Sequence, residues 1–194
     1  ICQSSLNSTS LGVIPLGPPG WLTQTSTRPN LALPVGKGTW SANSLPWLSI
    51  GYEAKLSPLQ ILTVYNAVAN NGTLMRPYMV SELRQQGIVV DKIQPIILEK
   101  KICKPSTINS LQKMMESVIS DGTGKNLKSE SYAIAGKTGT AQNPHGEDHS
   151  IFIAFAPKEN PKIAIAVYVE NGGWGSTWAA PIASLMIEKY LKRS

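Results

Sequence analysis

Acidic residues are scarce in this sequence, and none occurs before Glu53 in its 194 residues. Only 15% of the chain is charged, with 18 Lys and Arg against 12 Asp and Glu, which gives a formal net charge of +6. The basic residues do not form the clustered runs of a nucleic-acid-binding surface, so we expect no nucleic-acid partner. The mild basic excess suits acidic polymers, anionic membranes or substrates that carry a carboxylate.

Cysteines are few, and long apolar runs are missing. Cys2 and Cys103 lie far apart without a Cys-x-x-Cys spacing, which indicates neither a disulfide framework nor a zinc site and leaves the redox compartment open. No apolar run approaches the roughly 18 residues of a membrane span, and no signal-peptide pattern is present. The sequence starts at Ile1 without Met, so we expect a fragment.

Enough apolar sequence is nevertheless present to build a core. With 42% hydrophobic residues, the chain can form one domain or the larger part of one. Residues 1–35 are rich in Ser, Thr, Pro and Gly without periodicity, which predicts an irregular segment. We treat them separately from residues 36–194.

Three stretches have the apolar spacing and end signals of helices. The first starts with Ser57 as cap and Pro58 at the first helical position, and stops at residues 70–72. The second starts at a Ser106 cap and ends at residues 121–124. The third covers residues 180–191. The first helix has a broad apolar face formed by Leu59, Leu62, Val64, Tyr65, Val68 and Ala69. The second is expected to place Ile108, Leu111, Met115, Val118 and Ile119 inward. The third has Ile182, Leu185, Met186 and Tyr190 near one face.

Strand-like sequence precedes the last helix. Residues 132–142, 150–156 and 163–170 predict three sequential antiparallel strands, with the C-terminal helix packed on the sheet. Short apolar runs between residues 79 and 99 indicate short strands or extended connections. These elements predict an α+β fold in which the C-terminal helix covers one face of an antiparallel sheet and further helices cover the other.

The sequence Gly-Lys-Thr-Gly-Thr-Ala-Gln at residues 136–142 combines a cation, hydroxyls and flexible glycines. A carboxylate beside a reacting carbonyl could be bound jointly by Lys137, Thr138, Gly139 and Thr140. A phosphate-binding loop would need a glycine five positions before Gly136, where the sequence has another residue. The pattern therefore favours carboxylate binding over phosphate binding.

Several stretches resemble the C-terminal part of the transpeptidase domain of class B penicillin-binding proteins. They are residues 135–142, 149–157 and 163–171, and the resemblance extends over roughly residues 36–194. Residues 36–41 and 178–182 are similar to the elongation-type enzyme, penicillin-binding protein 2. Residues 51–53 and 57–60 lean toward the division-type relatives. Residues 8–35 show little likeness to the family.

The resemblance implies a serine D,D-transpeptidase that cross-links peptidoglycan stem peptides ending in D-Ala-D-Ala and that β-lactams acylate. It implies that Lys137 and the hydroxyls of Thr138 and Thr140 bind the donor carboxylate, and that the Thr140 N–H is a catalytic oxyanion donor. It implies that Gly139 leaves room for substrate along the strand. It also implies no cofactor, no metal, a place on the periplasmic side of the inner membrane, and a cell-wall synthesis complex as partner.

The nucleophile motif Ser-x-x-Lys of the family has no convincing copy here. One literal match starts at Ser110 and ends at Lys113, but it lies 27 residues before Lys137, inside the second predicted helix. We interpret it as surface residues of that helix. Ser5 and Asn7 match the family's Ser-x-Asn motif within low-complexity sequence. We therefore expect the isolated chain to be inactive.

Other polar features have plainer explanations. The cluster His145, Glu147, Asp148 and His149 is interpreted as solvated turn residues rather than metal ligands. Trp174 either shapes the mouth of a substrate groove or anchors a glycine-rich turn. Three functions stay open: part of a transpeptidase, a non-catalytic relative that binds peptidoglycan peptide or a cell-wall partner, and a related hydrolase or β-lactam receptor.

Overall fold

The computed structural model describes residues 2–3, 42–51 and 56–192. The chain divides into two compact units, residues 17–61 and residues 1–16 together with 62–194. Apart from residues 2–3, the irregular segment expected at residues 1–35 lies outside the described part. The Ser-x-Asn match at residues 5–7 and the resemblance at residues 36–41 also lie outside it. The division at residues 35 and 36 stays a prediction.

Within the unit of residues 17–61, the described part contains helix α1 (Ser44–Ser49) and the first turn of α2 (Pro58–Ala69). The start of α2 is a reciprocal capping box: the Ser57 N–H donates to Gln60 Oε1 at 2.8 Å, and the Gln60 N–H donates to Ser57 Oγ at 3.3 Å. Pro58 takes the first helical position, where its missing N–H is not needed. The predicted start of this helix is confirmed.

The larger unit contains a four-stranded antiparallel sheet with strand order β1-β8-β7-β6. Its strands are β1 (Cys2–Gln3), β6 (Ala135–Ala141), β7 (His149–Ala156) and β8 (Ile163–Val169). The three sequential strands predicted before the last helix are thus confirmed. In the described part of the chain, β6 pairs with β7 alone and forms one edge of the sheet.

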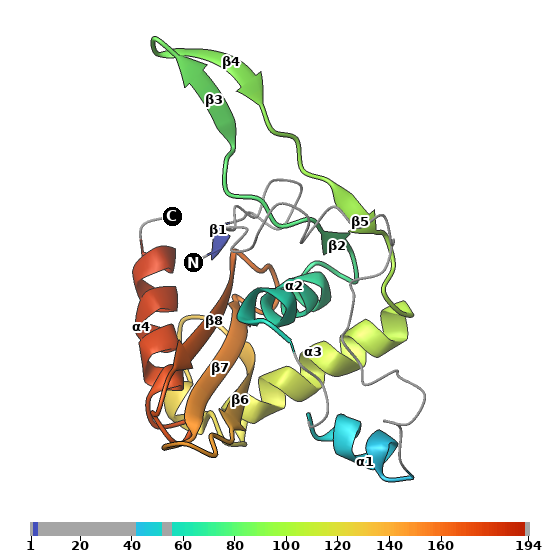
Figure 1. Ribbon diagram of the computed structural model, residues 1–194, viewed down its shortest axis with the longest axis vertical. Coiled ribbons are helices and arrows are strands. Elements are labelled where there is room, and N and C mark those ends of the chain that lie inside the picture. The colour runs from blue at the N-terminus through green and yellow to red at the C-terminus, as the bar shows by residue number, and fades with distance from the viewer. Residues whose placement is uncertain (1, 4–41, 52–55, 193–194) are drawn as a thin grey trace. The chain divides into compact units, whose positions relative to one another are not determined.

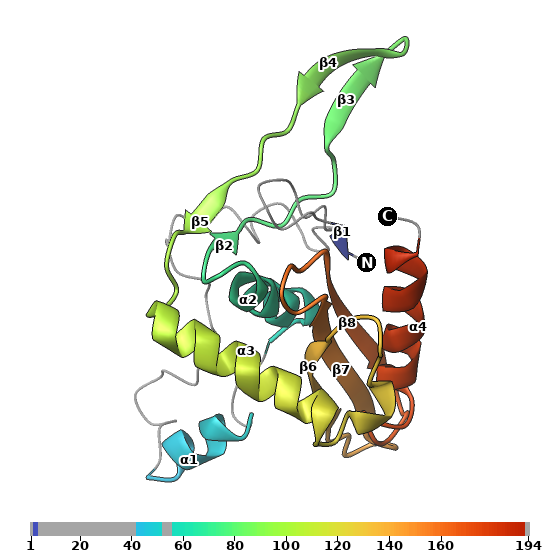
Figure 2. The same ribbon diagram turned by 180° about the vertical axis from the view of Figure 1, so that it is seen from behind.

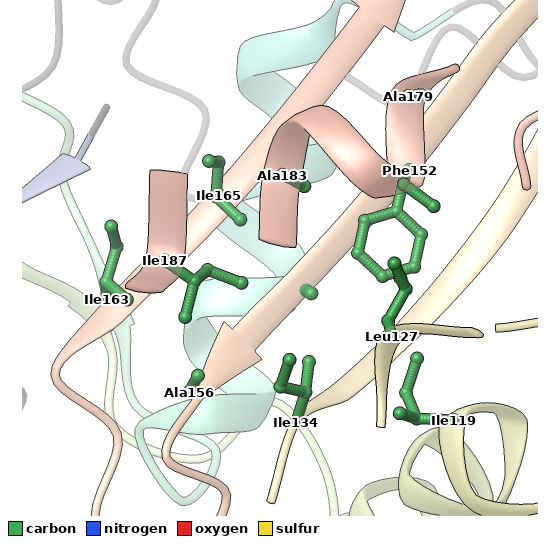
Figure 3. Close-up of a cluster of buried hydrophobic side chains, with 12 residues drawn as sticks. Ile119, Leu127, Ile134, Phe152, Ala156, Ile163, Ile165, Ala179, Ala183 and Ile187 are labelled. Carbon is green, nitrogen blue, oxygen red and sulfur yellow. The ribbon is translucent and has the colours of Figure 1, made fainter. Parts of the chain in front are cut away.

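Side chains that alternate along the strands build a core on each face of the sheet. On one face, Phe152 and Ile165 pack with Ile187 of helix α4 (Ala179–Leu191), as Figure 3 shows. On the other face, Phe155 and Ala164 pack against residues of α2 and of α3 (Pro105–Ser120). The central strands are apolar on both sides because both sides are covered.

Figures 1 and 2 show α4 along one face of the sheet, and α2 and α3 on the other. This arrangement confirms the predicted α+β fold. The apolar face predicted for α4 is only partly buried, because Ile182 and Leu185 are 40% and 67% exposed. The fully buried residues are Ala179, Ala180, Ala183 and Ile187. Small alanine side chains let the helix approach the strands closely, and this determines which face turns inward.

Two further sequence predictions need correction. Helix α3 begins at Pro105, with Lys104 rather than Ser106 as the N-cap, because proline fits the first helical position and the Lys104 carbonyl already accepts from the Thr107 and Ile108 amides. In α2, Val64 is 47% exposed whereas Asn66 is buried at 1% exposure. The apolar spacing alone did not identify the buried polar residue.

A pair of two-stranded ribbons connects α2 to α3. Strand β2 (Leu74–Met75) pairs with β5 (Ile97–Glu99), and β3 (Glu82–Gln85) pairs with β4 (Ile88–Lys92). The β3–β4 turn uses Gln86 and Gly87 with φ of 51° and 82°, the conformation that a tight hairpin requires. The short strands predicted between residues 79 and 99 are confirmed. Figure 1 shows this hairpin extending away from the sheet.

Candidate functional site

Strand β6 holds the four residues that the motif singled out. Lys137 pairs with Ile153 of β7, Thr138 with Phe152, and Thr140 with Ser150. One long edge of β6 has no partner strand among the described residues. Alternate backbone N–H and C=O groups of such a strand point away from its neighbour and are available to a ligand lying alongside.

Lys137 and Thr140 are both exposed on this strand. The Lys137 ammonium donates to the Thr138 carbonyl oxygen, with Nζ and O 2.5 Å apart. Across the described ranges, no carboxylate lies within ion-pair distance of this ammonium. The positive charge is therefore not neutralised by the described part of its own chain, which suits binding of an external anion.

Thr138 differs from its neighbours because it is buried, at 9% exposure. Its hydroxyl lies 2.7 Å from the hydroxyl of Thr123, and either oxygen can be the donor. Thr123 belongs to the turn between α3 and the 3₁₀ helix η1 (Lys125–Leu127). The structure thus adds to the motif a second hydroxyl that lies 15 residues earlier in the chain.

Gly139 is closely packed across the sheet. A Cβ atom added to it would lie 3.3 Å from Cβ of Ile151, a tight contact. Gly175, in the loop between β8 and α4, approaches the same place. A Cβ on Gly175 would collide with the carbonyl oxygens of both Gly139 and Ile151. The loop can therefore cross the β6–β7 pair only because residue 175 has no side chain.

Ser150 of β7 fixes this loop and the start of α4. It is fully buried, its hydroxyl donates to the Trp174 carbonyl at 2.9 Å, and its oxygen accepts from the Ala179 N–H at 3.1 Å. The second bond satisfies one of the amide groups that a helix start leaves without a partner. Trp174 itself has a fixed backbone but a side chain that is 74% exposed. Both interpretations of Trp174 therefore remain open.

The polar loop between β6 and β7 is held by hydrogen bonds within the loop and to the turn after β8. Asp148 Oδ1 accepts from the Asn143 N–H at 3.2 Å, and His149 Nδ1 accepts from the Asn171 N–H at 3.1 Å. Searching the described residues finds no group of three or more His, Cys, Asp or Glu side chains arranged to hold a metal ion. Asp148 and His149 therefore anchor the loop through these two hydrogen bonds.

Ser110 and Lys113, the literal match to a nucleophile motif, are both exposed on α3. The Ser110 hydroxyl donates to the Ser106 carbonyl one turn earlier, at 3.0 Å. The prediction that they are surface residues of a helix is confirmed.

Among the described helices, none is both long and apolar enough to cross a membrane.

Sequence reasoning did not identify Thr123, Ser150 or Gly175 as part of this region. Thr123 was interpreted only within a helix stop signal, and Ser150 only as part of a strand pattern. The available signals in the sequence were a serine at the start of an apolar strand and a glycine directly after Trp174. Neither signal reveals which distant backbone group the residue contacts.

Comparison with protein families identifies the chain at the level of the domain. Residues 33–188 match the family model described as "Penicillin binding protein transpeptidase domain". The chain belongs to this family. The resemblance found in the sequence is thereby confirmed, and the antiparallel sheet with helices on both faces is the fold that the family shares with this chain.

Curated relatives share roughly a third of their residues with this chain over the aligned parts. The peptidoglycan D,D-transpeptidase PbpA of Mycolicibacterium smegmatis is 33% identical over 84% of this chain and 36% of the relative. The peptidoglycan D,D-transpeptidase MrdA of Haemophilus influenzae is 28% identical over 89% of this chain and 28% of the relative. Stage V sporulation protein D of Bacillus subtilis is 34% identical over 69% of this chain and 22% of the relative. The chain thus spans about a third of the relatives or less.

Solved structures agree with this assignment. Penicillin-binding protein A from M. tuberculosis, as its imipenem acyl-enzyme complex, superposes with a TM-score of 0.71 at 31% identity, covering 78% of this chain and 34% of that one. Pseudomonas aeruginosa PBP2 in complex with WCK 5153 gives a TM-score of 0.68 at 31% identity, covering 80% and 35%. The fold and the penicillin-binding family are therefore supported by both sequence and structure.

Proposed function

We propose that this chain forms the substrate-binding part of a peptidoglycan D,D-transpeptidase that cross-links the cell wall and is a target of β-lactams. The single observation that carries the proposal is that Lys137 and Thr140 are exposed on strand β6, whose outer edge has no partner strand among the described residues, in a chain of the penicillin-binding transpeptidase family. The relatives from M. smegmatis and H. influenzae are named peptidoglycan D,D-transpeptidases. The substrate would be a stem peptide that ends in D-Ala-D-Ala.

Each residue of the motif has a distinct role in this proposal. The Lys137 ammonium attracts the terminal carboxylate of the donor peptide, and the hydroxyls of Thr138 and Thr140 bond to it. The Thr140 N–H donates to the carbonyl oxygen that becomes negative in the tetrahedral intermediate, a contribution worth roughly 10²–10³ in rate. Gly139 keeps the strand without a side chain where the substrate backbone lies.

Acyl transfer also needs a nucleophile, which this chain does not provide convincingly. A serine would attack the carbonyl of the penultimate D-Ala, form an acyl-enzyme and release the terminal D-Ala; the amine of a second stem peptide would then take the acyl group. The residues of β6 bind and orient the donor for this attack. We place the reaction outside the cytoplasmic membrane, where peptidoglycan lies, and expect the full-length protein to work with other cell-wall synthesis proteins.

The test is acylation of the full-length protein by a fluorescent penicillin. We expect Lys137→Ala to lower the second-order acylation rate roughly 10- to 100-fold, because a hydrogen bond to a charged group is lost. Lys189→Ala removes the same charge from an exposed position on α4 and serves as the matched control, with an unchanged rate. Equal rates for the two variants would contradict the assigned role of Lys137.

A second candidate function uses the exposed residues of β6 without any covalent chemistry. A non-catalytic relative would bind peptidoglycan peptide through the same strand without forming a covalent bond. Intact mass after exposure to a β-lactam separates the two functions. A mass increase by one drug molecule supports the transpeptidase, whereas peptide binding without any adduct supports the non-catalytic function.

A further inference from the structure

The hydroxyl pair formed by Thr123 and Thr138 has a property that the family motif does not describe. Thr138 is buried in β6, whereas Thr123 is exposed in the turn after α3, and their oxygens are 2.7 Å apart. This is the usual distance of a hydrogen bond between two hydroxyls. The pair joins the strand that carries Lys137 to a separate element of the fold.

The turn that presents Thr123 is firmly held. The Gly124 N–H donates to the Val118 carbonyl at 2.9 Å, and the Leu127 N–H donates to the Gly124 carbonyl at 2.9 Å. Leu127 is buried in the core on the α4 side of the sheet. A Cβ on Gly122 would come within 2.9 Å of the Val118 backbone. The position of Thr123 is therefore set by backbone contacts on both sides.

Each hydroxyl has one hydrogen to donate and can accept two. If Thr138 donates to Thr123, only lone pairs of Thr138 are left, and these repel an anion. If Thr123 donates to Thr138, the Thr138 hydrogen is free. A carboxylate can only accept hydrogen bonds, so a carboxylate ligand requires the second arrangement.

We propose that Thr123 is a positioning residue: its hydroxyl donates to Thr138 and thereby directs the Thr138 hydrogen toward the carboxylate of the bound substrate or β-lactam. This inference rests on the proposed function and adds a residue to it. The chain of two hydroxyls and a carboxylate is also cooperative, since a hydroxyl that accepts a hydrogen bond becomes a better donor.

The experiment compares two substitutions in the full-length protein. Thr123→Val keeps the shape of the side chain and removes the hydroxyl, and we expect it to lower the rate of acylation by a penicillin roughly fivefold to tenfold. Thr123→Ser retains the hydroxyl and should restore most of that loss. Because Thr123 is exposed, both variants should keep their melting temperatures within about 2 °C.

Two further measurements separate positioning from a general structural role. In a Thr138→Val background, Thr123→Val should have no additional effect on acylation, because the two hydroxyls act as one unit. With the methyl ester of the same penicillin, which lacks the anionic carboxylate, Thr123→Val should leave the rate unchanged. A structural defect would instead lower the rates for the acid and the ester equally.

The outcomes for the two proposals are distinguishable. Normal acylation of the unmodified protein together with an unaffected Thr123→Val variant would overturn the role of Thr123 alone. So would equal losses for acid and ester, or a further loss in the Thr138→Val background. No acylation of the unmodified protein would overturn the proposed transpeptidase function, and the role of Thr123 with it.

Discussion

Tyr168 on β8 shows how burial of a single polar atom affects stability. Its hydroxyl is buried and has no hydrogen-bond partner among the described residues. Burial, followed by the charge of Tyr65 on α2, raises the pKa of Tyr168 to about 12. Burial also raises the pKa of Tyr65. Both phenols are therefore held in the neutral form in the folded protein.

The raised pKa predicts a loss of stability at alkaline pH. Since the pKa is about 10 in the unfolded chain and about 12 in the folded one, the contribution of Tyr168 is complete below pH 10 and is lost as the pH rises through about 12. Tyr168→Phe should therefore lose less stability between pH 10 and 12. At pH 7 the variant should be equally or slightly more stable, because an unpaired hydroxyl is removed.

Chemical denaturation at a series of pH values measures this difference. The quantity to compare is the free energy of unfolding of Tyr168→Phe minus that of the unmodified protein. It should be flat up to pH 9 and rise above pH 10. A difference that stays constant to pH 12 would show that this phenol does not titrate differently in the folded and unfolded states.

At the scale of residues, the sequence was informative where a short motif defines the chemistry. It singled out Lys137 and Thr140, which the structure places exposed on a strand, and their binding roles are proposals. It could not find Thr123 or Ser150, because their partners lie 15 or more residues away and are set by tertiary packing. It also missed buried Asn66, since helical periodicity marks apolar positions and not polar exceptions.

At the scale of elements, the loop between β8 and α4 packs against strands β6 and β7. The backbone of Gly175 packs on Gly139 and Ile151, and Ser150 holds the adjacent Trp174 carbonyl. A side chain at residue 175 would collide with the backbone of β6 and β7.

Gly175→Ala should disturb both stability and function. The added methyl group should cost about 1–3 kcal/mol of folding free energy, the usual range for overpacking. By displacing Gly139, it should also lower β-lactam acylation roughly tenfold or more, since small misplacements of a binding strand are costly. Thermal unfolding and acylation rates measure the two effects.

Gly173→Ala is the matched control in the same loop. It has φ of 68°, which an alanine adopts with strain, but its added Cβ meets nothing within 4 Å. We expect a loss of about 1 kcal/mol with acylation unchanged. If the two variants lost the same acylation rate, contact between Gly175 and β6 would not be what positions the strand.

The order of elements could be predicted better than their exact ends and faces. Strand-like stretches at residues 132–142, 150–156 and 163–170 predicted β6, β7 and β8, and capping signals predicted α2. The start of α3 was misplaced because proline at the first helical position shifted the cap to Lys104. The buried face of α4 was misjudged because alanines, which carry little apolar signal, pack against the sheet.

At the scale of the molecule, the chain belongs to the penicillin-binding transpeptidase family but spans about a third or less of its relatives PbpA, MrdA and stage V sporulation protein D. The chain contains the sheet with β6 at one edge, and helices of the same chain cover both faces of that sheet. The family resemblance, rather than periodicity, gave the substrate and the expected reaction. The chain carries no convincing copy of the family's nucleophile motif, and it spans only part of the length of these relatives.

The central claim is that strand β6 binds the carboxylate of a cell-wall peptide or of its β-lactam analogue. A crystal structure of the full-length protein after reaction with a penicillin tests it most directly. We predict the drug carboxylate at hydrogen-bond distance, roughly 2.7–3.2 Å, from Lys137 Nζ or the Thr140 hydroxyl, with the ligand along the free edge of β6. A drug carboxylate bound elsewhere, or a β6 edge paired with another segment of the protein, would contradict the claim.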